Sequence, residues 1–269
     1  LHQNNVTIYS TGGTETFIKD LGIPVVAVED ITVFPEILGG RVKTLHPKIF
    51  GGILNRQDHA GDVEQMKEFN IPQIDLVIVD LYPFEKTVAS GAGEQDIIEK
   101  IDIGGISLIR AAAKNYKDVV IISCKELYRP FMEILKKNGT NTTEEERAFF
   151  AASAFDTTSK YDIAIFNYLN KDSSVPSFKA NFSESKPLRY GENPHQKGTY
   201  FGSENSLPKQ LHGKEISHNN LLDIEAAIEL ISDFDDTTVA VIKHTNACGC
   251  ASGSTVVEAW KRALEADPV

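Results

Sequence analysis

The sequence is short of cysteine and of long apolar runs, and each shortage excludes a class of protein. Its three cysteines, Cys124, Cys248 and Cys250, are too few and too unevenly spaced for a disulfide framework, and no CxxC pair provides a zinc site. No apolar run is long enough to span a bilayer, and the chain does not start with a basic segment followed by an apolar one. We therefore expect a cytoplasmic protein with no membrane partner.

Basic residues are also in short supply. The formal net charge is -11, from 27 lysines and arginines against 38 aspartates and glutamates. A broad nucleic-acid surface needs an excess of cations to release counterions from the phosphates. We therefore expect no nucleic-acid partner, and any bound phosphate has to be met by local basic groups.

The chain is long enough for one large or two smaller domains, since it has 269 residues of which 41% are hydrophobic. Leu1 is not an initiator residue, so we expect the chain to begin inside a longer one. Residues 1–170 alternate strand and helix patterns, which predicts a three-layer α/β domain with a mostly parallel sheet. Residues 171–186 carry serines, a proline and alternating charges typical of a linker, and residues 187–269 form a second unit.

The periodicity predicts individual elements in both units. The predicted strands are 6–9, 24–28, 74–84, 118–123 and 238–242, and the predicted helices are 15–21, 58–69, 107–114, 127–136, 144–170, 221–231 and 254–265. No internal repeat or low-complexity tract is apparent.

The stretch from Gly39 to Pro47 has the composition of an anion site. Gly39 and Gly40 remove side-chain bulk where a phosphate needs main-chain donors, Arg41 offers a planar fork and Lys43 a movable charge. The alternative is a surface turn with two solvated cations.

A second phosphate cradle is predicted at Ser10–Thr14, a turn of hydroxyl and glycine residues between a strand and a helix. The free N–H groups at the helix start and the hydroxyls of Thr11 and Thr14 would point toward an anion. The alternative is that Thr14 is an ordinary N-cap.

Further polar groups lie at the ends of predicted elements. Asp80 and Tyr82 come at the carboxyl end of a nearly continuous apolar strand, where ligands sit in open α/β sheets. Asp102 precedes a glycine pair near a helix start, and Lys114 lies near that helix's end. Each has a structural alternative: a strand-terminating Asp, a packed Tyr, or a helix cap.

The second unit has two polar stretches. Residues 187–196 are dense in hydrogen-bonding groups and poor in periodicity, which favours a binding segment or a sharp turn. His244 follows Lys243 at the exit of a buried strand, where the alternative is a histidine bonded to the backbone. Cys248 and Cys250 are interpreted as small core residues.

Taken together, these motifs resemble one family. The set comprises Ser10–Thr14, Gly40–Pro47, Leu81–Phe84, Ile101–Gly105, Ala111–Asn115, Leu188–Gln196 and Lys243–Asn246. In this order it resembles the bifunctional AICAR transformylase/IMP cyclohydrolase family of purine biosynthesis. The resemblance implies that residues 1–170 are the cyclohydrolase, of methylglyoxal-synthase-like fold, and that residues 187–269 begin a formyltransferase domain of cytidine-deaminase-like α/β fold.

The chain departs from the family in four places. The resemblance implies a strand and a loop ahead of Leu1 that help to hold the nucleotide phosphate, and a formyltransferase domain that continues beyond Val269. We therefore expect weakened nucleotide binding and no formyl transfer from this chain alone. Asp80 stands where relatives often have Asn, and Ala247 where bacterial relatives often have Pro.

The resemblance also implies site residues. Lys43, Tyr82, Asp102 and Lys114 match the catalytic positions of the cyclohydrolase, with Lys114 moving protons, Asp102 orienting it or taking a proton, and Lys43 and Tyr82 polarising a carbonyl. The substrate-binding set is Thr11, Gly12, Gly13, Thr14, Arg41, Val42, Thr44, Val79, Asp80, Ile103 and Gly104. In the second unit Arg189 and Tyr190 would bind the aminoimidazole ribotide, and Lys243 and His244 would assist formyl transfer, with His244 as base.

Several partners follow from the same resemblance. The substrates are purine ribotides, 10-formyltetrahydrofolate is the cosubstrate of the formyltransferase, the cyclohydrolase needs no cofactor or metal, and the assembly is a homodimer. The alternative from another class is a non-catalytic module that binds a phosphate-bearing effector, since the same fold serves that purpose; a lyase of the methylglyoxal synthase kind is a further option. The discriminating feature is the set Lys43, Tyr82, Asp102 and Lys114, which a binder does not need.

Overall fold

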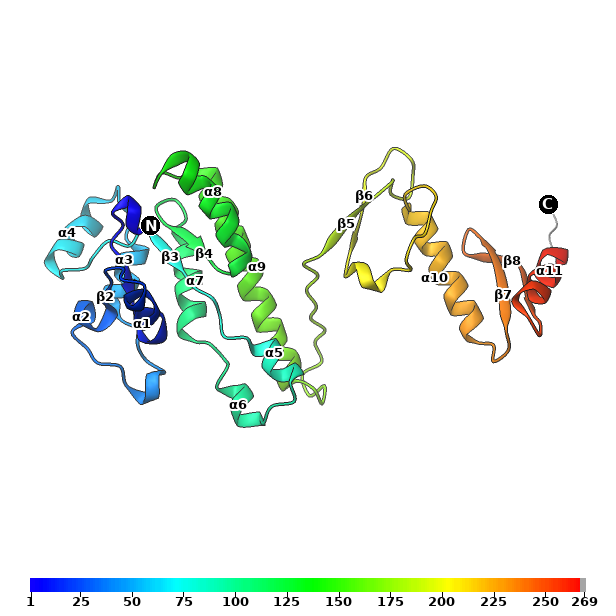
Figure 1. The fold of residues 1–269 in the computed structure, drawn as a ribbon, viewed down its shortest axis with the longest axis horizontal. Coiled ribbons are helices and arrows are strands. Elements are labelled where there is room, and N and C mark those ends of the chain that lie inside the picture. Colours follow the sequence, from blue (N-terminus) through cyan, green and yellow to red (C-terminus); the bar gives the residue numbers. More distant parts are fainter. Residues whose placement is uncertain (267–269) are drawn as a thin grey trace. The chain divides into compact units, whose positions relative to one another are not determined.

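The computed structural model describes residues 1–266, apart from the side chain of Glu204, and the chain divides into two compact units (Figure 1). The first unit ends at Asn181 and the second begins at Phe182, so the division falls inside the predicted linker. The last three residues of the predicted second domain lie outside the described residues.

The first unit contains four short strands among many helices. In chain order its elements are η1 (His2–Asn4), β1 (Tyr9–Ser10), α1 (Gly12–Asp20), β2 (Val26–Ala27), α2 (Val28–Thr32), η2 (Leu38–Gly40), α3 (Pro47–Leu54), α4 (Ala60–Glu68), β3 (Leu76–Ile78), α5 (Phe84–Ala89), α6 (Glu94–Ile98), α7 (Gly104–Lys114), β4 (Val120–Ile122), η3 (Lys125–Leu127), α8 (Tyr128–Asn138) and α9 (Glu144–Leu169).

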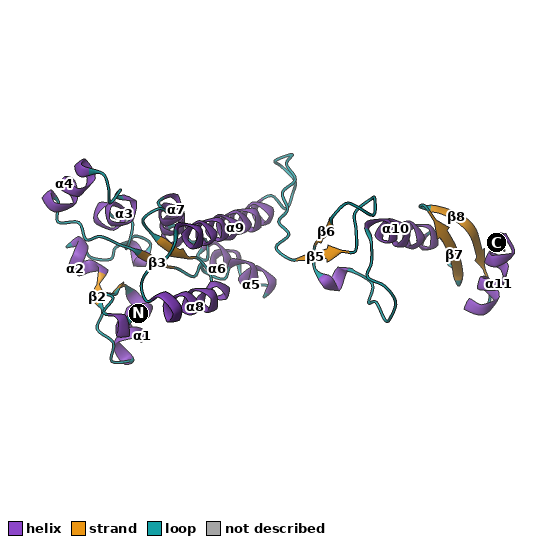
Figure 2. Ribbon diagram, turned by 90° about the horizontal axis from the view of Figure 1, so that it is seen from above, coloured by secondary structure: helices purple, strands orange, loops and turns teal. Residues whose placement is uncertain are grey.

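The strands pair in parallel, as the sequence predicts. β1 pairs with β2 through Tyr9 and Val26, and β3 pairs with β4 through Leu76 and Val120. Figure 2 shows α7 and α9 on one side of the β3–β4 pair and α8 on the other. The first unit therefore has the helix–sheet–helix order of an α/β domain.

The strand predicted over residues 74–84 is wrong in length. β3 is hydrogen-bonded into a ladder only over Leu76–Ile78, after which the Val79 N–H still donates to the Ile122 carbonyl at 3.0 Å. Pro83 has no N–H to continue a ladder, and α5 begins at Phe84. Apolar composition predicts burial, whereas the length of a strand depends on its partner.

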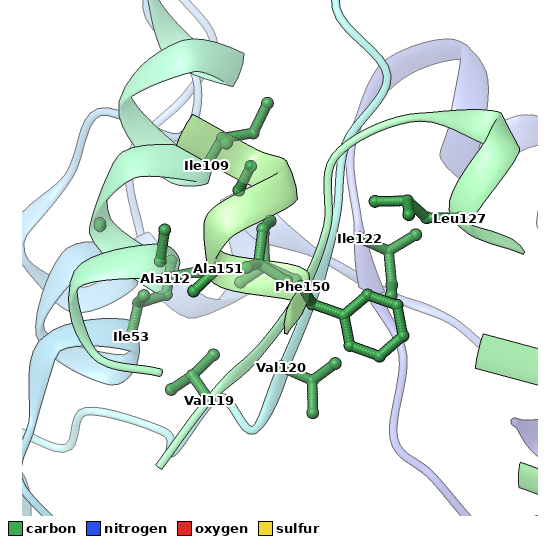
Figure 3. Close-up of a cluster of buried hydrophobic side chains, with 14 of the residues drawn as sticks. Ile53, Ile109, Ala112, Val119, Val120, Ile122, Leu127, Phe150 and Ala151 are labelled. Carbon is green, nitrogen blue, oxygen red and sulfur yellow. The ribbon is translucent and has the colours of Figure 1, made fainter. Parts of the chain in front are cut away.

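The core of the first unit lies where α7 and α9 pack on β4. Figure 3 shows Ile109 and Ala112 of α7 and Phe150 and Ala151 of α9 gathered around the strand. Ile109, Ala112 and Phe150 have no exposed surface. The alanines in the second half of α7 let it approach its neighbours closely, so packing fixes the position of that half of the helix.

Local signals set the helix ends where they are strong. α9 starts with a capping box in which the Thr143 hydroxyl accepts the Glu146 N–H and the Glu146 carboxylate accepts the Thr143 N–H. α3 was not predicted, although His46 caps it through Nδ1 and Pro47 occupies its first turn. The helix predicted over 15–21 begins earlier, at Gly12, so Thr11 rather than Thr14 is the N-cap.

Up to residue 266, the second unit consists of two antiparallel strand pairs and two main helices. Its elements are β5 (Ser185–Leu188), β6 (Gly198–Phe201), η4 (Glu204–Ser206), α10 (His218–Ser232), β7 (Thr238–Lys243), β8 (Asn246–Ser252) and α11 (Val256–Ala266). The sequence patterns do not predict β5, β6 or β8, and β5 takes up the end of the predicted linker. α11 packs so closely on β8 that a methyl group on Gly249 would lie 2.1 Å from the Ala263 carbonyl oxygen.

Within residues 1–266, no helix is long and apolar enough to cross a membrane.

Candidate functional site

The two predicted phosphate cradles lie against each other. Gly12 begins α1 with a φ of 57°, and a methyl group placed on it would lie 3.2 Å from Lys43 Nζ. Gly40 has a φ of 89°, and a methyl group there would lie 2.7 Å from Glu36 Oε1 and 2.8 Å from Lys43 Cε. Both glycines have positive φ values that disfavour other residues, and a side chain at either one would displace the end of Lys43, so the two turns meet at this lysine.

The start of α7 joins this group. A methyl group on Gly104 would lie 3.4 Å from Thr44 Oγ1, so α7 begins beside Thr44. At the other end of α7 the Asn115 amide donates to the carbonyls of Ile53 and Asn55 at 2.9 and 2.8 Å. α3 and α7 therefore run side by side in the same direction.

Three helices consequently begin around Lys43 and Thr44. They are α1 at Gly12, α3 at Pro47 and α7 at Gly104. A helix start carries about half a positive charge, which favours an anion. At α3, however, His46 already accepts the N–H groups of Lys48, Ile49 and Phe50, so the unpaired N–H groups at this end belong to α1 and α7. This end of the first unit therefore has the backbone geometry of a phosphate site.

The polar side chains at this site are paired with glutamates. Lys43 Nζ lies 2.7 Å from Glu36 Oε2, and the Thr11 hydroxyl donates to Glu29 Oε1 at 3.1 Å. Arg41 forms an ion pair with Glu99, on the turn that follows α6. The glutamates hold these donors in place and also neutralise the two cations.

The remaining predicted binding residues of the two cradles fall on the same elements. Val42 closes the loop before it through a bridge with Ile37, whose N–H donates to the Val42 carbonyl at 3.3 Å. Gly13 and Thr14 lie in the first turn of α1, and Ile103 is the N-cap of α7.

Asp102 lies immediately before α7 and accepts backbone hydrogen bonds. Its Oδ1 accepts the Gly105 N–H at 2.6 Å, and a methyl group on Gly105 would lie 2.6 Å from Oδ2. Burial raises the pKa of Asp102, while backbone hydrogen bonds from Gly105 and Tyr82 act in the opposite direction. Lys100 Nζ lies 5.5 Å from the centre of the Tyr82 ring, so Tyr82 and Asp102 occupy one neighbourhood.

Val79 and Asp80 follow β3, and Asp80 contacts the start of α8. The Tyr128 hydroxyl donates to Asp80 Oδ2 at 3.1 Å, and Lys125 Nζ lies 3.9 Å from the same oxygen. Burial, and then the charge of Asp80, raise the pKa of Tyr128 to about 12. The negative charge of Asp80 is thus met by the Tyr128 hydroxyl and the Lys125 ammonium group.

Lys114 lies far from the other predicted catalytic residues of this chain. It is the last residue of α7, ten residues beyond Gly104, which separates the two by about 15 Å along the helix axis. Its side chain is exposed. A single chain therefore does not bring Lys114 to Lys43 and Asp102.

In the second unit, α10 connects the two predicted site segments. The Arg189 guanidinium donates to the Tyr190 hydroxyl at 3.1 Å, and hydrogen bonds from Ser217 and Arg189 lower the pKa of Tyr190. The His218 N–H, at the start of α10, donates to the Tyr190 carbonyl at 3.1 Å. Tyr190 is thus held at the N-terminus of this helix.

Lys243 and His244 lie at the turn between β7 and β8. His244 and Thr245 have φ values of 54° and 62°, and the Thr245 N–H donates to Asp223 Oδ1 of α10 at 2.8 Å. Such φ values are unusual for residues other than glycine and asparagine, so the hydrogen bond to Asp223 helps to hold the turn in this strained conformation.

Two open cavities accompany these elements, one in each unit. The cavity of the second unit, about 560 Å³, is lined by Asp223, Asn220 and Ile242 among others, next to the segments just described. The cavity of the first unit, about 460 Å³, lies between α4 and the residues after α3, away from Lys43. In the part of the chain that the structure describes, no three His, Cys, Asp or Glu side chains are grouped to hold a metal ion.

Comparison with known protein families gives a match for each part of the chain. The model of the AICARFT/IMPCHase bienzyme matches residues 112–269, and the model of the MGS-like domain matches residues 1–107. The chain belongs to the AICARFT/IMPCHase bienzyme family. The resemblance drawn from its motifs is confirmed.

Individual relatives agree with this assignment. The Bifunctional purine biosynthesis proteins PurH of Bacteroides thetaiotaomicron and Rhodospirillum rubrum are 58% and 46% identical to it, and each match covers 100% of this chain and 53% of the relative. The chain thus spans about half the length of the curated relatives it matches. A crystal structure of ForH is 31% identical, with a TM-score of 0.55, and the match covers 62% of this chain and 86% of that one.

Sequence reasoning missed the residues that hold the site together. Glu29, Glu36 and Glu99 pair with the predicted anion-binding side chains, and Tyr161 of α9 contacts the segment that carries Asp102. Glu99 and Arg41 are 58 residues apart, and Tyr161 and Asp102 are 59 apart. No local pattern marks partners at that separation.

Proposed function

We propose that the first unit closes 5-formamidoimidazole-4-carboxamide ribotide to inosine monophosphate with loss of water. In this reaction the carboxamide nitrogen attacks the formyl carbon of the neighbouring substituent. The reacting groups belong to one molecule, so the protein accelerates the reaction by holding them in plane and by moving protons.

The observation that carries this proposal is the meeting of the starts of α1 and α7 at Lys43 and Thr44. A ribotide phosphate carries two negative charges near neutral pH, and unpaired N–H groups at helix starts suit it better than isolated side chains do. With the phosphate there, the base of the ribotide extends toward the neighbouring segment of Tyr82 and Asp102. Thr11, Gly12, Gly13, Thr14, Arg41, Val42, Thr44, Ile103 and Gly104 would hold phosphate and ribose, with Val79 and Asp80 nearer the base.

The side chains have complementary roles in ring closure. Lys43 and Tyr82 stabilise negative charge that develops on the formyl oxygen, and Asp102 accepts a proton from the attacking nitrogen. A carboxylate whose pKa is raised by burial is a stronger base than an exposed one, which suits Asp102 to this role. No step requires a metal or a cofactor.

The proposed catalytic role of Lys114 depends on how copies of the chain assemble. Lys114 is about 15 Å along α7 from Gly104, so its catalytic role requires that it enters the site of a second copy. We therefore propose a homodimer in which the Lys114 ammonium group of one copy completes the site of the other.

The second unit would supply part of the formyltransferase. Arg189 and Tyr190 would bind the aminoimidazole ribotide, Lys243 and His244 would assist transfer from 10-formyltetrahydrofolate, and α10 links the two segments. The protein would work in the cytoplasm, where its purine ribotide substrates are made.

Absorbance in the ultraviolet tests the proposal, because ring closure changes the chromophore. Adding the formylated ribotide to this chain should produce inosine monophosphate, and Asp102→Asn should lower turnover about a hundredfold or more while nucleotide binding persists. Asp96→Asn, an exposed aspartate of α6, is the matched control and should change neither. Tight binding of the ribotide without turnover by the wild-type chain would instead favour the non-catalytic effector module.

A further inference from the structure

Tyr161 of α9 makes a pair of hydrogen bonds that the proposed mechanism does not yet use. Its hydroxyl accepts the Asp102 N–H at 2.9 Å and donates to the Lys100 carbonyl at 2.5 Å. The side chain is 8% exposed and lies in an apolar cluster with Phe84 and Ile97. One phenol thus fixes both ends of the three-residue turn 100–102.

This turn carries two groups of the proposed site. Asp102 bears the carboxylate that would accept a proton, and Lys100 places its ammonium group over the ring of Tyr82. Asp102 enters α7 directly, since Gly105 donates to its carboxylate from the first turn of that helix. Movement of the turn would therefore shift Asp102 and, at the same time, weaken the contact of Lys100 with the Tyr82 ring.

We infer that Tyr161 is a positioning residue for ring closure, which fixes Asp102 through the main chain of residues 100–102. This inference rests on the proposed cyclohydrolase function. Tyr161 need not contact substrate, because both of its hydrogen bonds are to the backbone.

Rigidity is the reason that α9 can serve this purpose. α9 is 26 residues long and packs against α7 and β4, and the ring of Tyr161 meets Phe84 edge-on with ring centroids 6.1 Å apart. A hydroxyl on a packed ring has little freedom, so it holds its two partners within a narrow range of positions.

The chain offers a matched control on the same helix. Tyr168 also meets Phe84 edge-on, with ring centroids 5.8 Å apart, and forms part of the same apolar cluster. Tyr161→Phe and Tyr168→Phe both remove one hydroxyl from an aromatic contact with Phe84. Only the first removes the hydrogen bonds to the turn.

Ring-closure kinetics on the 269-residue chain test the inference. Tyr161→Phe should lower kcat about tenfold to a hundredfold with KM little changed, because the reacting groups are misplaced rather than unbound, and Tyr168→Phe should keep wild-type kinetics. If Tyr161 acts through Asp102, the double variant Tyr161→Phe/Asp102→Asn should be no slower than Asp102→Asn alone. Equal kinetics for the two tyrosine variants, or fully additive losses in the double variant, would overturn the inference.

Hydrogen exchange separates this inference from the proposed function. The Asp102 amide should exchange about tenfold or more faster in Tyr161→Phe than in the wild type, and should be unchanged in Tyr168→Phe. That result with no ring closure by the wild-type chain would refute the function and leave the contact established. Unchanged exchange in Tyr161→Phe would refute the role of Tyr161 whatever the activity.

Discussion

Two inactive variants, Lys43→Ala and Lys114→Ala, should restore activity to each other when they form mixed dimers. Lys43 lies at the start of α1 and α3, whereas Lys114 ends α7 about 15 Å from the start of that helix. If one reaction centre needs both, the two ammonium groups must come from different copies. A mixed dimer then contains one site with both lysines and one site with neither.

The size of the recovery follows from this geometry. When equal amounts of the two chains pair at random, about half of the dimers are mixed and each has one complete site out of two, so activity should reach about a quarter of wild type. Each variant alone should lose about a hundredfold or more, because a charge that stabilises the transition state is gone. The recovery therefore stands well above the background.

Co-expression with two different affinity tags and sequential purification gives the mixed dimer alone, and ultraviolet absorbance follows ring closure. Since one of its two sites is complete, the purified mixed dimer should reach about half of wild-type activity. The control mixes Lys43→Ala with Asp102→Asn, two positions at the same end of α7 in one chain, and should show no recovery. No gain in the purified Lys43→Ala/Lys114→Ala dimer would refute the shared site, and with it the catalytic role of Lys114.

Three further predictions concern single positions. Gly40→Ala should weaken nucleotide binding and lower the melting temperature more than Gly91→Ala does. Both glycines have positive φ, so each substitution costs about 1–2 kcal/mol of backbone strain, but only a methyl group at position 40 would also crowd Lys43 and Glu36. Because burial raises the pKa of Asp102 above 3.8, its protonated form favours the folded state; the wild type should therefore lose stability relative to Asp102→Asn as the pH rises above about 4, measured by thermal unfolding. A wild-type minus variant difference that does not change with pH would contradict this. Asp223→Ala should speed exchange of the Thr245 amide about tenfold, whereas Asp223→Asn keeps an acceptor oxygen and should retain most of the protection.

The elements that sequence predicted well are those with local signals. α9 was predicted over 144–170 and found at Glu144–Leu169, because its capping box and its length leave little ambiguity. The strand over 74–84 was overestimated, because apolar residues continue past the point where a partner strand stops. α3 is not predicted because it is only eight residues long and its N-cap is a histidine, which is not one of the residues that usually mark a helix start.

The sequence predicts which turns carry the hydrogen-bond donors of the site, but not the long-range contacts that hold these turns together. The turns at Gly12 and Gly40 were identified from composition, and the structure brings both against Lys43. The position of Lys114 could have been anticipated, since a helix predicted over 107–114 already separates it from Asp102. The contact of Tyr161 with residues 100–102 could not, because it depends on how α9 packs after the chain has folded.

The glutamates beside the proposed phosphate site explain how an acidic chain can hold two cations close together there. Lys43 is paired with Glu36, Arg41 with Glu99 and the Thr11 hydroxyl with Glu29. A ribotide phosphate must therefore replace these carboxylates or share their partners, and it gains only the difference between the two sets of hydrogen bonds. In the proposed function the helix starts supply that difference, because their N–H groups would bind the phosphate and do not donate to these glutamates. On this proposal, selectivity for a phosphate would come from the backbone, while the side-chain pairs hold Lys43, Arg41 and Thr11 in place before the phosphate binds.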